Sequence, residues 1–193
     1  PRILGHWFVL LRCTTQMLEK RDDPELKAIN DRCIDAIMNY HHNPEYDLIN
    51  EYVNHDLSRI DNDHGQVVSG HSPETLWMVM SEAIRRKDRA LFERAAAHLK
   101  RHAEVLWDDV YGGFMSLRHV DRNEWNTGKS LWLQEEVLIG TMCVLEHTGA
   151  QWAKDWFSKV YTYVLDKFPL KQYGYPLWIL YADRKVTFKE HYN

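Results

Sequence analysis

The chain has 193 residues and a mass of 23.0 kDa, enough for one domain with a substantial hydrophobic core and no need of disulfide bonds. Hydrophobic residues make up 45% and charged residues 27% of the sequence, which excludes a disordered or fibrous protein. The 24 basic and 28 acidic side chains are evenly mixed and give a formal net charge of -4. We therefore expect no nucleic-acid surface and no basic membrane-binding helix.

The longest apolar runs are much shorter than the roughly 18–20 residues that cross a bilayer, so we expect no membrane span. The chain begins at Pro1 without an initiator Met or a signal-peptide pattern, which suggests a fragment of a cytoplasmic protein. Cys13, Cys33 and Cys143 are odd in number, form no CxxC pair and lie in apolar helical contexts. We expect three free, buried thiols in a reducing compartment.

Apolar periodicity predicts six helices and no strand of comparable length. The expected ranges are 2–20, 24–42, 72–87, 88–107, 129–148 and 150–168. The second, fourth and sixth carry one apolar stripe, which is typical of a helix with one wet face. The first, third and fifth are apolar around most of their circumference, as in Trp7–Leu11, Leu76–Met80 and Val137–Ile139. We expect these three inner helices to be buried on all sides.

Short links within each helix pair and long links between pairs predict three repeated inner–outer hairpins. The long segments that follow the hairpins are Asn43–Gly70, Asp108–Gly128 and Pro169–Asn193. We expect them at one end of the assembly, with short strands at 117–120 or 178–181 around turns such as 182–184. The unequal spacing of the inner helices favours a closed ring over an open solenoid, and a closed ring needs more than three pairs.

The segment Gly70-His71-Ser72-Pro73-Glu74 predicts the start of the third helix. Ser72 suits the N-cap, Pro73 the first helical position and Glu74 the positive end of the helix. His71 then lies within one turn of Glu74, and a histidine beside a carboxylate can act as a general base near neutral pH. The alternative is that Ser-Pro-Glu only starts a helix and that His71 is a surface residue.

A second polar cluster, at the start of the fifth helix, contains Lys129, Trp132, Gln134 and Glu136 and follows the turn 112–114. Polar side chains in an apolar helix need hydrogen-bond partners when buried, and a sugar offers many hydroxyls. Trp132 offers a flat face for the apolar side of a pyranose. The alternative is that Gln134 and Glu136 pair with backbone groups or a neighbouring arginine.

Four motifs in register resemble the N-acylglucosamine 2-epimerase family, which includes cellobiose 2-epimerases and aldose-ketose isomerases. Gly70-His71-x-x-Glu74 is similar to the family's Gly-His-x-x-Glu, and Asp109-x-x-Gly112-Gly113-Phe114 to its Asp-x-x-Gly-Gly-Phe. Lys129-x-Leu131-Trp132-x-Gln134-x-Glu136 is similar to Lys-x-Trp-Trp-x-Gln-x-Glu, and Tyr173-Gly174 stands where the family has Tyr-Gly-Glu-Trp. Leu131 and Pro176 replace family tryptophans, and Glu51 resembles the acidic residue that precedes the Gly-His motif.

The resemblance implies an all-α (α/α)6 barrel, of which residues 1–193 form a single partial domain, about three hairpins of the C-terminal half. It implies C2 epimerisation or aldose-ketose isomerisation of an unmodified mono- or disaccharide through an enediol(ate), with no cofactor and no metal. The implied residues are His71 as acid/base catalyst and Glu74, Trp132, Gln134, Glu136 and Glu51 for substrate binding. The family's second catalytic histidine, in a His-x-Pro-Arg motif, falls beyond Asn193, and His191 does not fit it. We therefore expect the 193-residue chain to be inactive by itself; a homodimer is possible.

Two other functions remain open. One is an (α/α)6 glycoside or unsaturated-uronide hydrolase that uses a pair of carboxylates among Glu51, Asp56, Asp109 and Glu136. The other is a non-catalytic sugar- or protein-binding helical-repeat protein, which would carry an exposed apolar patch on its outer helices.

The remaining histidines show no pattern of metal ligation. His98 and His102 are four residues apart on an outer helix but lack the Glu-x-x-His setting of a zinc site, so we expect them to pack or to face solvent. His41, His42, His55 and His64 lie in a polar loop without metal-ligand spacing, and the sequence assigns them no role.

Overall fold

The computed structural model describes residues 1–60, 70–120, 122–172, 174–181 and 184–185. The helices within these residues are α1 (Leu4–Leu18), α2 (Pro24–Asp35), α3 (His71–Arg86), α4 (Arg89–Leu106), α5 (Leu131–Thr148) and α6 (Gln151–Lys167). A π-helical segment, η1 (Ala36–Tyr40), continues α2. All six predicted helices are confirmed, and the second is completed by the π-helical segment.

Local sequence accounts for most of the helix ends. Asp23, Asp88 and Ser130 each accept a backbone N–H of the first turn, at the starts of α2, α4 and α5 respectively. Pro24 follows its cap at the first helical position, where no N–H is needed. Gly149 ends α5 with a φ of 66°, in the left-handed conformation that glycine adopts without strain.

The start of α3 differs from the prediction. The helix begins at His71, its N-cap is Gly70, and no side chain caps it. Ser72 lies inside the first turn, where its buried hydroxyl donates to the carbonyl of Ile49, 3.2 Å away. The predicted N-cap role of Ser72 is therefore wrong, because the hydroxyl finds its partner in the preceding loop. Pro73 still fits, since the first turn of a helix has N–H groups without intrahelical partners.

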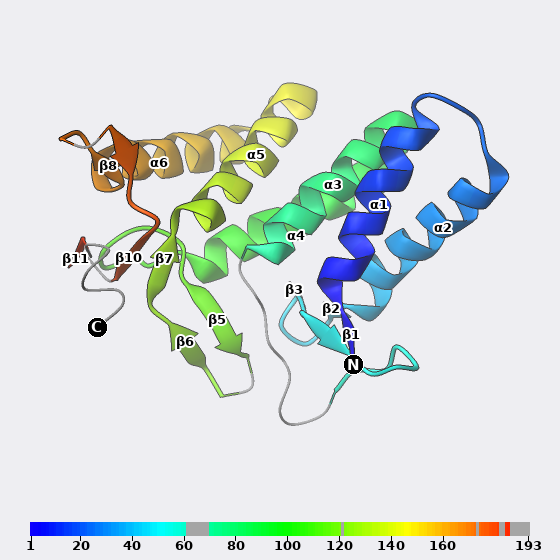
Figure 1. Ribbon diagram of the computed structural model, residues 1–193, viewed down its shortest axis with the longest axis horizontal. Helices are drawn as coiled ribbons and strands as arrows, with labels where there is room; N and C mark the ends of the chain where they lie inside the picture. Colours follow the sequence, from blue (N-terminus) through cyan, green and yellow to red (C-terminus); the bar gives the residue numbers. More distant parts are fainter. Residues whose placement is uncertain (61–69, 121, 173, 182–183, 186–193) are drawn as a thin grey trace.

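The inner helices α1, α3 and α5 form a row in which α3 packs against both α1 and α5. The outer helices α2, α4 and α6 each return along the inner helix that precedes them (Figure 1). One apolar core joins the first two hairpins around Leu76 and Leu99, and a second joins α4, α5 and α6 around Phe114 and Val137. The predicted arrangement of three inner–outer hairpins is confirmed.

Two of the inner helices keep an exposed apolar side. Val9, Leu10 and Met17 of α1 are exposed, as are Ile139 and Met142 of α5. The prediction that all three inner helices are buried on all sides is therefore wrong for α1 and α5. The physical reason is their position, because in the described part of the chain each stands at one end of the inner row and has an inner neighbour on one side only.

Short antiparallel strands gather at the end of the helices where α1, α3 and α5 begin (Figure 1). The strand pairs are β1 (Arg2–Ile3) with β4 (Tyr52–Val53), β2 (His42–Asn43) with β3 (Leu48–Ile49), β5 (Ser116–His119) with β6 (Glu124–Asn126), and β8 (Pro169–Leu170) with β9 (Tyr175–Pro176). A small sheet has the order β11 (Arg184–Lys185), β10 (Ile179–Tyr181), β7 (Gly128–Ser130). The strands expected near 117–120 and 178–181 are confirmed, while residues 182–183 of the expected turn lie outside the described residues.

The three cysteines are free, but they differ in burial. Cys33 is buried, Cys143 is half-buried and Cys13 is exposed. Burial raises the pKa of Cys33 to about 11, which keeps it in the thiol form. The prediction of three buried thiols is wrong for Cys13, because it lies on a part of α1 that no other described residue covers. Within the described part of the chain, no helix combines the length and apolar character needed to cross a bilayer.

Candidate functional site

His71 opens α3, and its ring faces Glu51, the residue before β4. Nδ1 of His71 lies 3.0 and 2.9 Å from the two carboxylate oxygens of Glu51. Glu51 is 2% exposed, and its backbone carbonyl accepts the N–H of Leu4 at 2.8 Å, which holds it against α1. A carboxylate at Nδ1 favours the tautomer that leaves the lone pair on Nε2. The partner that orients His71 is therefore Glu51 and not Glu74.

The electrostatic surroundings of His71 favour its protonated form. Burial lowers the pKa of His71, but the hydrogen bond and charge of Glu51, together with the charges of Glu74 and Glu136, raise it overall. The His71 side chain is 32% exposed, so a ligand can reach it. This group can take up and release a proton near neutral pH at an accessible position.

Aromatic rings from α1 and α5 flank the imidazole. The ring of Trp132 meets His71 edge-on with centroids 5.5 Å apart, and the ring of Phe8 lies 5.3 Å away. A Cβ at position 70 would lie 2.2 Å from two ring atoms of Trp132, so the close approach requires Gly70. The contacts around the imidazole thus join all three inner helices, through Phe8 of α1, His71 of α3 and Trp132 of α5.

Glu74 and Glu136 add two partly desolvated carboxyl groups. Burial, and next the charge of Glu136, raises the pKa of Glu74 to about 7, against the opposing effect of His71. Burial also raises the pKa of Glu136, against hydrogen bonds from Trp77 and Trp132. The indole Nε1 of Trp77 donates to Glu136 at 2.6 Å. Near neutral pH the site therefore contains a carboxyl group that can donate or accept a hydrogen bond.

Gln134 has a different environment from the rest of the predicted site. Its side chain is fully buried, and its amide oxygen accepts the N–H of Phe114 at 2.8 Å. Its amide nitrogen donates to the carbonyls of Phe114 and Ser130 at 3.2 and 3.1 Å. Both amide hydrogens are thus used within the protein. This favours the alternative that the sequence left open, in which Gln134 pairs with the backbone.

Lys129 has a buried partner in the same region. Its Nζ lies 2.6 Å from a carboxylate oxygen of Asp108, and both side chains are buried. The other oxygen of Asp108 accepts two backbone N–H groups of the turn that follows, and the Asp108 N–H donates to the carbonyl of Gly113. Asp109 is exposed. The acidic residue that holds this turn is therefore Asp108, one position before the aspartate of the quoted motif.

The carboxylates considered for a hydrolase do not form one group. Glu51 and Glu136 both act on His71, whereas Asp56 and Asp109 are exposed on loops. Asp56 accepts hydrogen bonds from Ser58 within its own turn. Among the described residues, large exposed apolar side chains are few on the outer helices, with Ile29 on α2 and Tyr161 and Leu165 on α6.

The other histidines divide into buried and exposed groups. His102 is fully buried, and its Nε2 accepts the N–H of Ile49 at 3.0 Å, which confirms that it packs. His41 is buried against the carbonyl of Asn50, and burial lowers its pKa to about 4. His55 is exposed, and His64 lies outside the described residues. Sequence spacing missed that His42 and His98 approach one another, because one lies in the hairpin β2–β3 and the other on α4.

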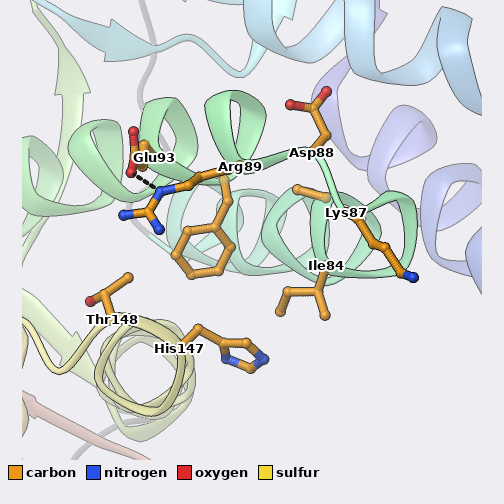
Figure 2. Close-up of a pocket in the computed structure, with 9 residues that line it drawn as sticks. Ile84, Lys87, Asp88, Arg89, Glu93, His147 and Thr148 are labelled. Carbon is orange, nitrogen blue, oxygen red and sulfur yellow. Dashed lines mark hydrogen bonds and ion pairs between the residues drawn. The ribbon is translucent and has the colours of Figure 1, made fainter.

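A groove at the opposite end of the helices lies between the α3–α4 link and the end of α5 (Figure 2). Ile84, His147 and Thr148 line it, and Arg89 at its edge pairs with Glu93 at 2.7 Å. No residue of the His71 cluster lines this groove. We use this name for His71, Glu51, Glu74, Trp132 and Glu136. It is therefore separate from the candidate active site.

Together, the fold and the site define a helical-hairpin protein with a paired histidine and carboxylate at the mouth of its inner helices. The sequence profile of the N-acylglucosamine 2-epimerase (GlcNAc 2-epimerase) family matches residues 13–192. The chain belongs to the N-acylglucosamine 2-epimerase family, as its motifs predict. A search of curated proteins gives no significant match.

Several solved structures share the fold. Cellobiose 2-epimerase from Bacillus thermoamylovorans B4167 has a TM-score of 0.82 at 15% identity, over 96% of this chain and 47% of that protein. A D-mannose isomerase has a TM-score of 0.82 at 14% identity, over 94% of this chain and 48% of that protein. A sugar epimerase from a ruminal bacterium has a TM-score of 0.79 at 12% identity, over 96% of this chain and 47% of that protein. The chain therefore spans about half the length of these structures, and its three hairpins have the (α/α)6 fold that the motifs imply.

Proposed function

We propose that the protein to which this chain belongs is a sugar 2-epimerase or aldose-ketose isomerase acting on an unmodified mono- or disaccharide. The observation that carries the proposal is the setting of His71. Its imidazole is partly exposed, the Glu51 carboxylate lies at Nδ1, and we assign the proton transfer to Nε2. Membership of the N-acylglucosamine 2-epimerase family supports the same reaction class. Two structural neighbours, a cellobiose 2-epimerase and a D-mannose isomerase, agree with it.

In the proposed reaction, Nε2 of neutral His71 removes the proton from C2 of the open-chain aldose. The C–H electron pair moves to form an enediol(ate), and the carboxylate of Glu51 stabilises the imidazolium that results. Return of a proton to C2 on the opposite face gives the epimer, and return to C1 gives the ketose. In both outcomes a second acid returns the proton, and we place this acid outside residues 1–193.

The remaining polar groups of the cluster suit a sugar. The indole of Trp132 offers a flat face to the apolar side of the ring. Glu74 and Glu136 offer carboxyl oxygens to hydroxyl groups, and the raised pKa of Glu74 allows it to donate as well as accept. Gln134 is assigned to the framework, where it bonds to the backbone of Phe114 and Ser130.

We propose that residues 1–193 form one partial domain, the C-terminal half of the barrel. The exposed apolar sides of α1 and α5 then pack against further inner helices in the complete protein. We expect the 193-residue chain by itself to be inactive. Measurable turnover by this chain would contradict the proposed location of the second acid.

The test uses the full-length protein in deuterated water with N-acetylmannosamine, mannose, glucose and cellobiose, followed by NMR of the C2 proton. We expect deuterium to replace this proton in at least one sugar. The exchange should be lost in His71→Ala and retained in His55→Ala, a matched change at an exposed histidine. Folded protein that exchanges no sugar, or a His71→Ala variant as active as wild type, would overturn the proposal. Cleavage of cellobiose without exchange would favour a hydrolase.

A further inference from the structure

Three metal-ligating side chains meet beside the hairpin β2–β3, and none of them belongs to the His71 cluster. His42 lies on β2, Asp47 in the turn before β3, and His98 on α4. Nε2 of His42 lies 2.9 Å and Nδ1 of His98 lies 3.0 Å from the same oxygen, Oδ1 of Asp47. The two imidazole centroids are 4.5 Å apart, and one ligand atom from each residue lies within 4.8 Å of the others.

One nitrogen of this cluster, Nδ1 of His98, lacks a well-aligned hydrogen bond within the protein. His98 is 8% exposed, and its Nδ1 is buried with no hydrogen-bond partner in suitable geometry, although Asp47 Oδ1 is close. A buried polar nitrogen without a partner is unfavourable and is rare in folded proteins. The Nδ1 of His98 lies 3.0 Å from the same carboxylate oxygen that His42 contacts. This arrangement is what an ion between the three groups would complete.

The surroundings hold the three groups in place. His102, one turn further along α4, accepts the N–H of Ile49 at 3.0 Å and so fixes the hairpin to the helix. Its Nδ1 faces the carbonyl of His98 at 2.8 Å. The ligand groups therefore project from two elements that are already joined by a buried hydrogen bond.

We propose that His42, Asp47 and His98 bind one divalent transition-metal ion of the zinc class. Two imidazole nitrogens and one carboxylate oxygen suit zinc and its neighbours better than magnesium or calcium, which prefer oxygen ligands. Tetrahedral zinc with bonds of about 2.0–2.2 Å places ligand atoms roughly 3.3 Å apart. The two imidazole nitrogens lie 2.9 and 3.0 Å from Oδ1 of Asp47, close to that spacing. The fourth position is left to water. The ion holds the hairpin against α4, immediately before the strand connection that carries Glu51.

The test uses the full-length protein stripped of metal with a chelator. Cobalt(II) is titrated while its visible absorption is recorded, and zinc(II) binding is measured by calorimetry. We expect one equivalent to bind. Asp47→Asn and His42→Gln should each weaken binding at least roughly 10–100-fold, the range seen even for changes beyond the direct ligands. His55→Gln, at an exposed histidine of the same loop, should bind as wild type does.

The variants are chosen to remain folded. Asp47 has a φ of 55°, and asparagine tolerates this left-handed conformation better than most residues. His42 is only half-buried, so we expect His42→Gln to fold as well. This variant then removes a second ligand independently of Asp47→Asn. Absence of stoichiometric binding, or equal binding by wild type and both variants, overturns the proposal and leaves a metal-free His-Asp-His cluster. The result is independent of any sugar chemistry, so its failure leaves the proposed function untouched.

Discussion

The substitution Glu51→Gln isolates the effect of the buried carboxylate on His71. Gln has nearly the same shape, but it carries no charge and can present an N–H group to Nδ1. The charge that raises the pKa of His71 is then lost, while burial, which lowers the pKa, remains. We therefore expect His71 to titrate at a lower pH in the variant than in the wild-type protein.

The size of the change follows from the geometry. A hydrogen bond to a charged group contributes about 1.5–3 kcal/mol, and one pKa unit corresponds to about 1.36 kcal/mol. Because the His71 side chain is 32% exposed, solvent screening reduces the effect to the lower end of that range. The titration midpoint of His71 should fall by about one pH unit.

Two readouts check this expectation in the full-length protein. NMR titration of labelled histidine rings gives the midpoint directly, with His71→Ala to assign the signal and Glu104→Gln as an exposed control. The acid limb of the kcat/KM profile for C2 exchange should move to lower pH by the same amount. The plateau of kcat/KM should also fall, within the factor of about 10²–10⁴ that general acid–base catalysis supplies. The reason is that a Gln N–H at Nδ1 favours the tautomer with its proton on Nε2, which cannot accept the C2 proton.

The sign of the stability effect gives a further check. The folded-state pKa of His71 is raised, so the stability that Glu51 contributes through it is present below pH 6.5 and is lost as pH rises through the folded-state pKa. The difference in unfolding free energy between wild type and Glu51→Gln should shrink over that window. A folded variant with an unchanged His71 midpoint and an unchanged pH profile would refute the charge coupling and with it the orienting role of Glu51.

Three further substitutions test the framework of the site by urea denaturation. Glu82→Ala removes a fully buried carboxylate that two arginines of α3 share, and we expect the free energy of unfolding to fall by about 3 kcal/mol; a loss within error would contradict its structural role. Gly70→Ala places a Cβ against the ring of Trp132 and should cost about 1–3 kcal/mol, with reduced C2 exchange; unchanged stability and exchange would show that the ring moves freely aside. Lys129→Met leaves the buried Asp108 unpaired and should cost about 3 kcal/mol, with the cost diminishing as acid protonates the carboxylate, and a cost independent of pH would contradict the ion pair.

The hairpins were predictable because their signal is local. Each outer helix shows one apolar stripe and each inner helix is apolar around most of its circumference, and short links force neighbours to pack antiparallel. The exposed sides of α1 and α5 were not predictable, since the sequence of a helix does not state how many neighbours it has. The start of α3 was misplaced by one residue for a similar reason, because the partner of Ser72 is the carbonyl of Ile49 in strand β3.

The site was predictable as a set of residue types and less so as a set of contacts. Spacing alone placed His71 at the mouth of α3, within one turn of Glu74. The pairing of His71 with Glu51 depends on a loop that returns to the inner row, and the bond from Trp77 to Glu136 depends on the packing of α3 against α5. Such contacts require the tertiary structure, because residues far apart in the sequence provide the two partners.

The motifs also combine two physical roles that a sequence does not separate. Gln134 and Lys129 stand in the same motif as Trp132 and Glu136, yet both form buried bonds within the framework. Their partners, the backbone of Phe114 and Asp108, hold the turn beneath the start of α5. A displacement of about 1 Å at a reacting centre can reduce the rate by about 10²-fold. Framework residues can therefore be as necessary to the proposed reaction as those that touch the sugar, so a motif can identify the family while only the geometry separates the two roles.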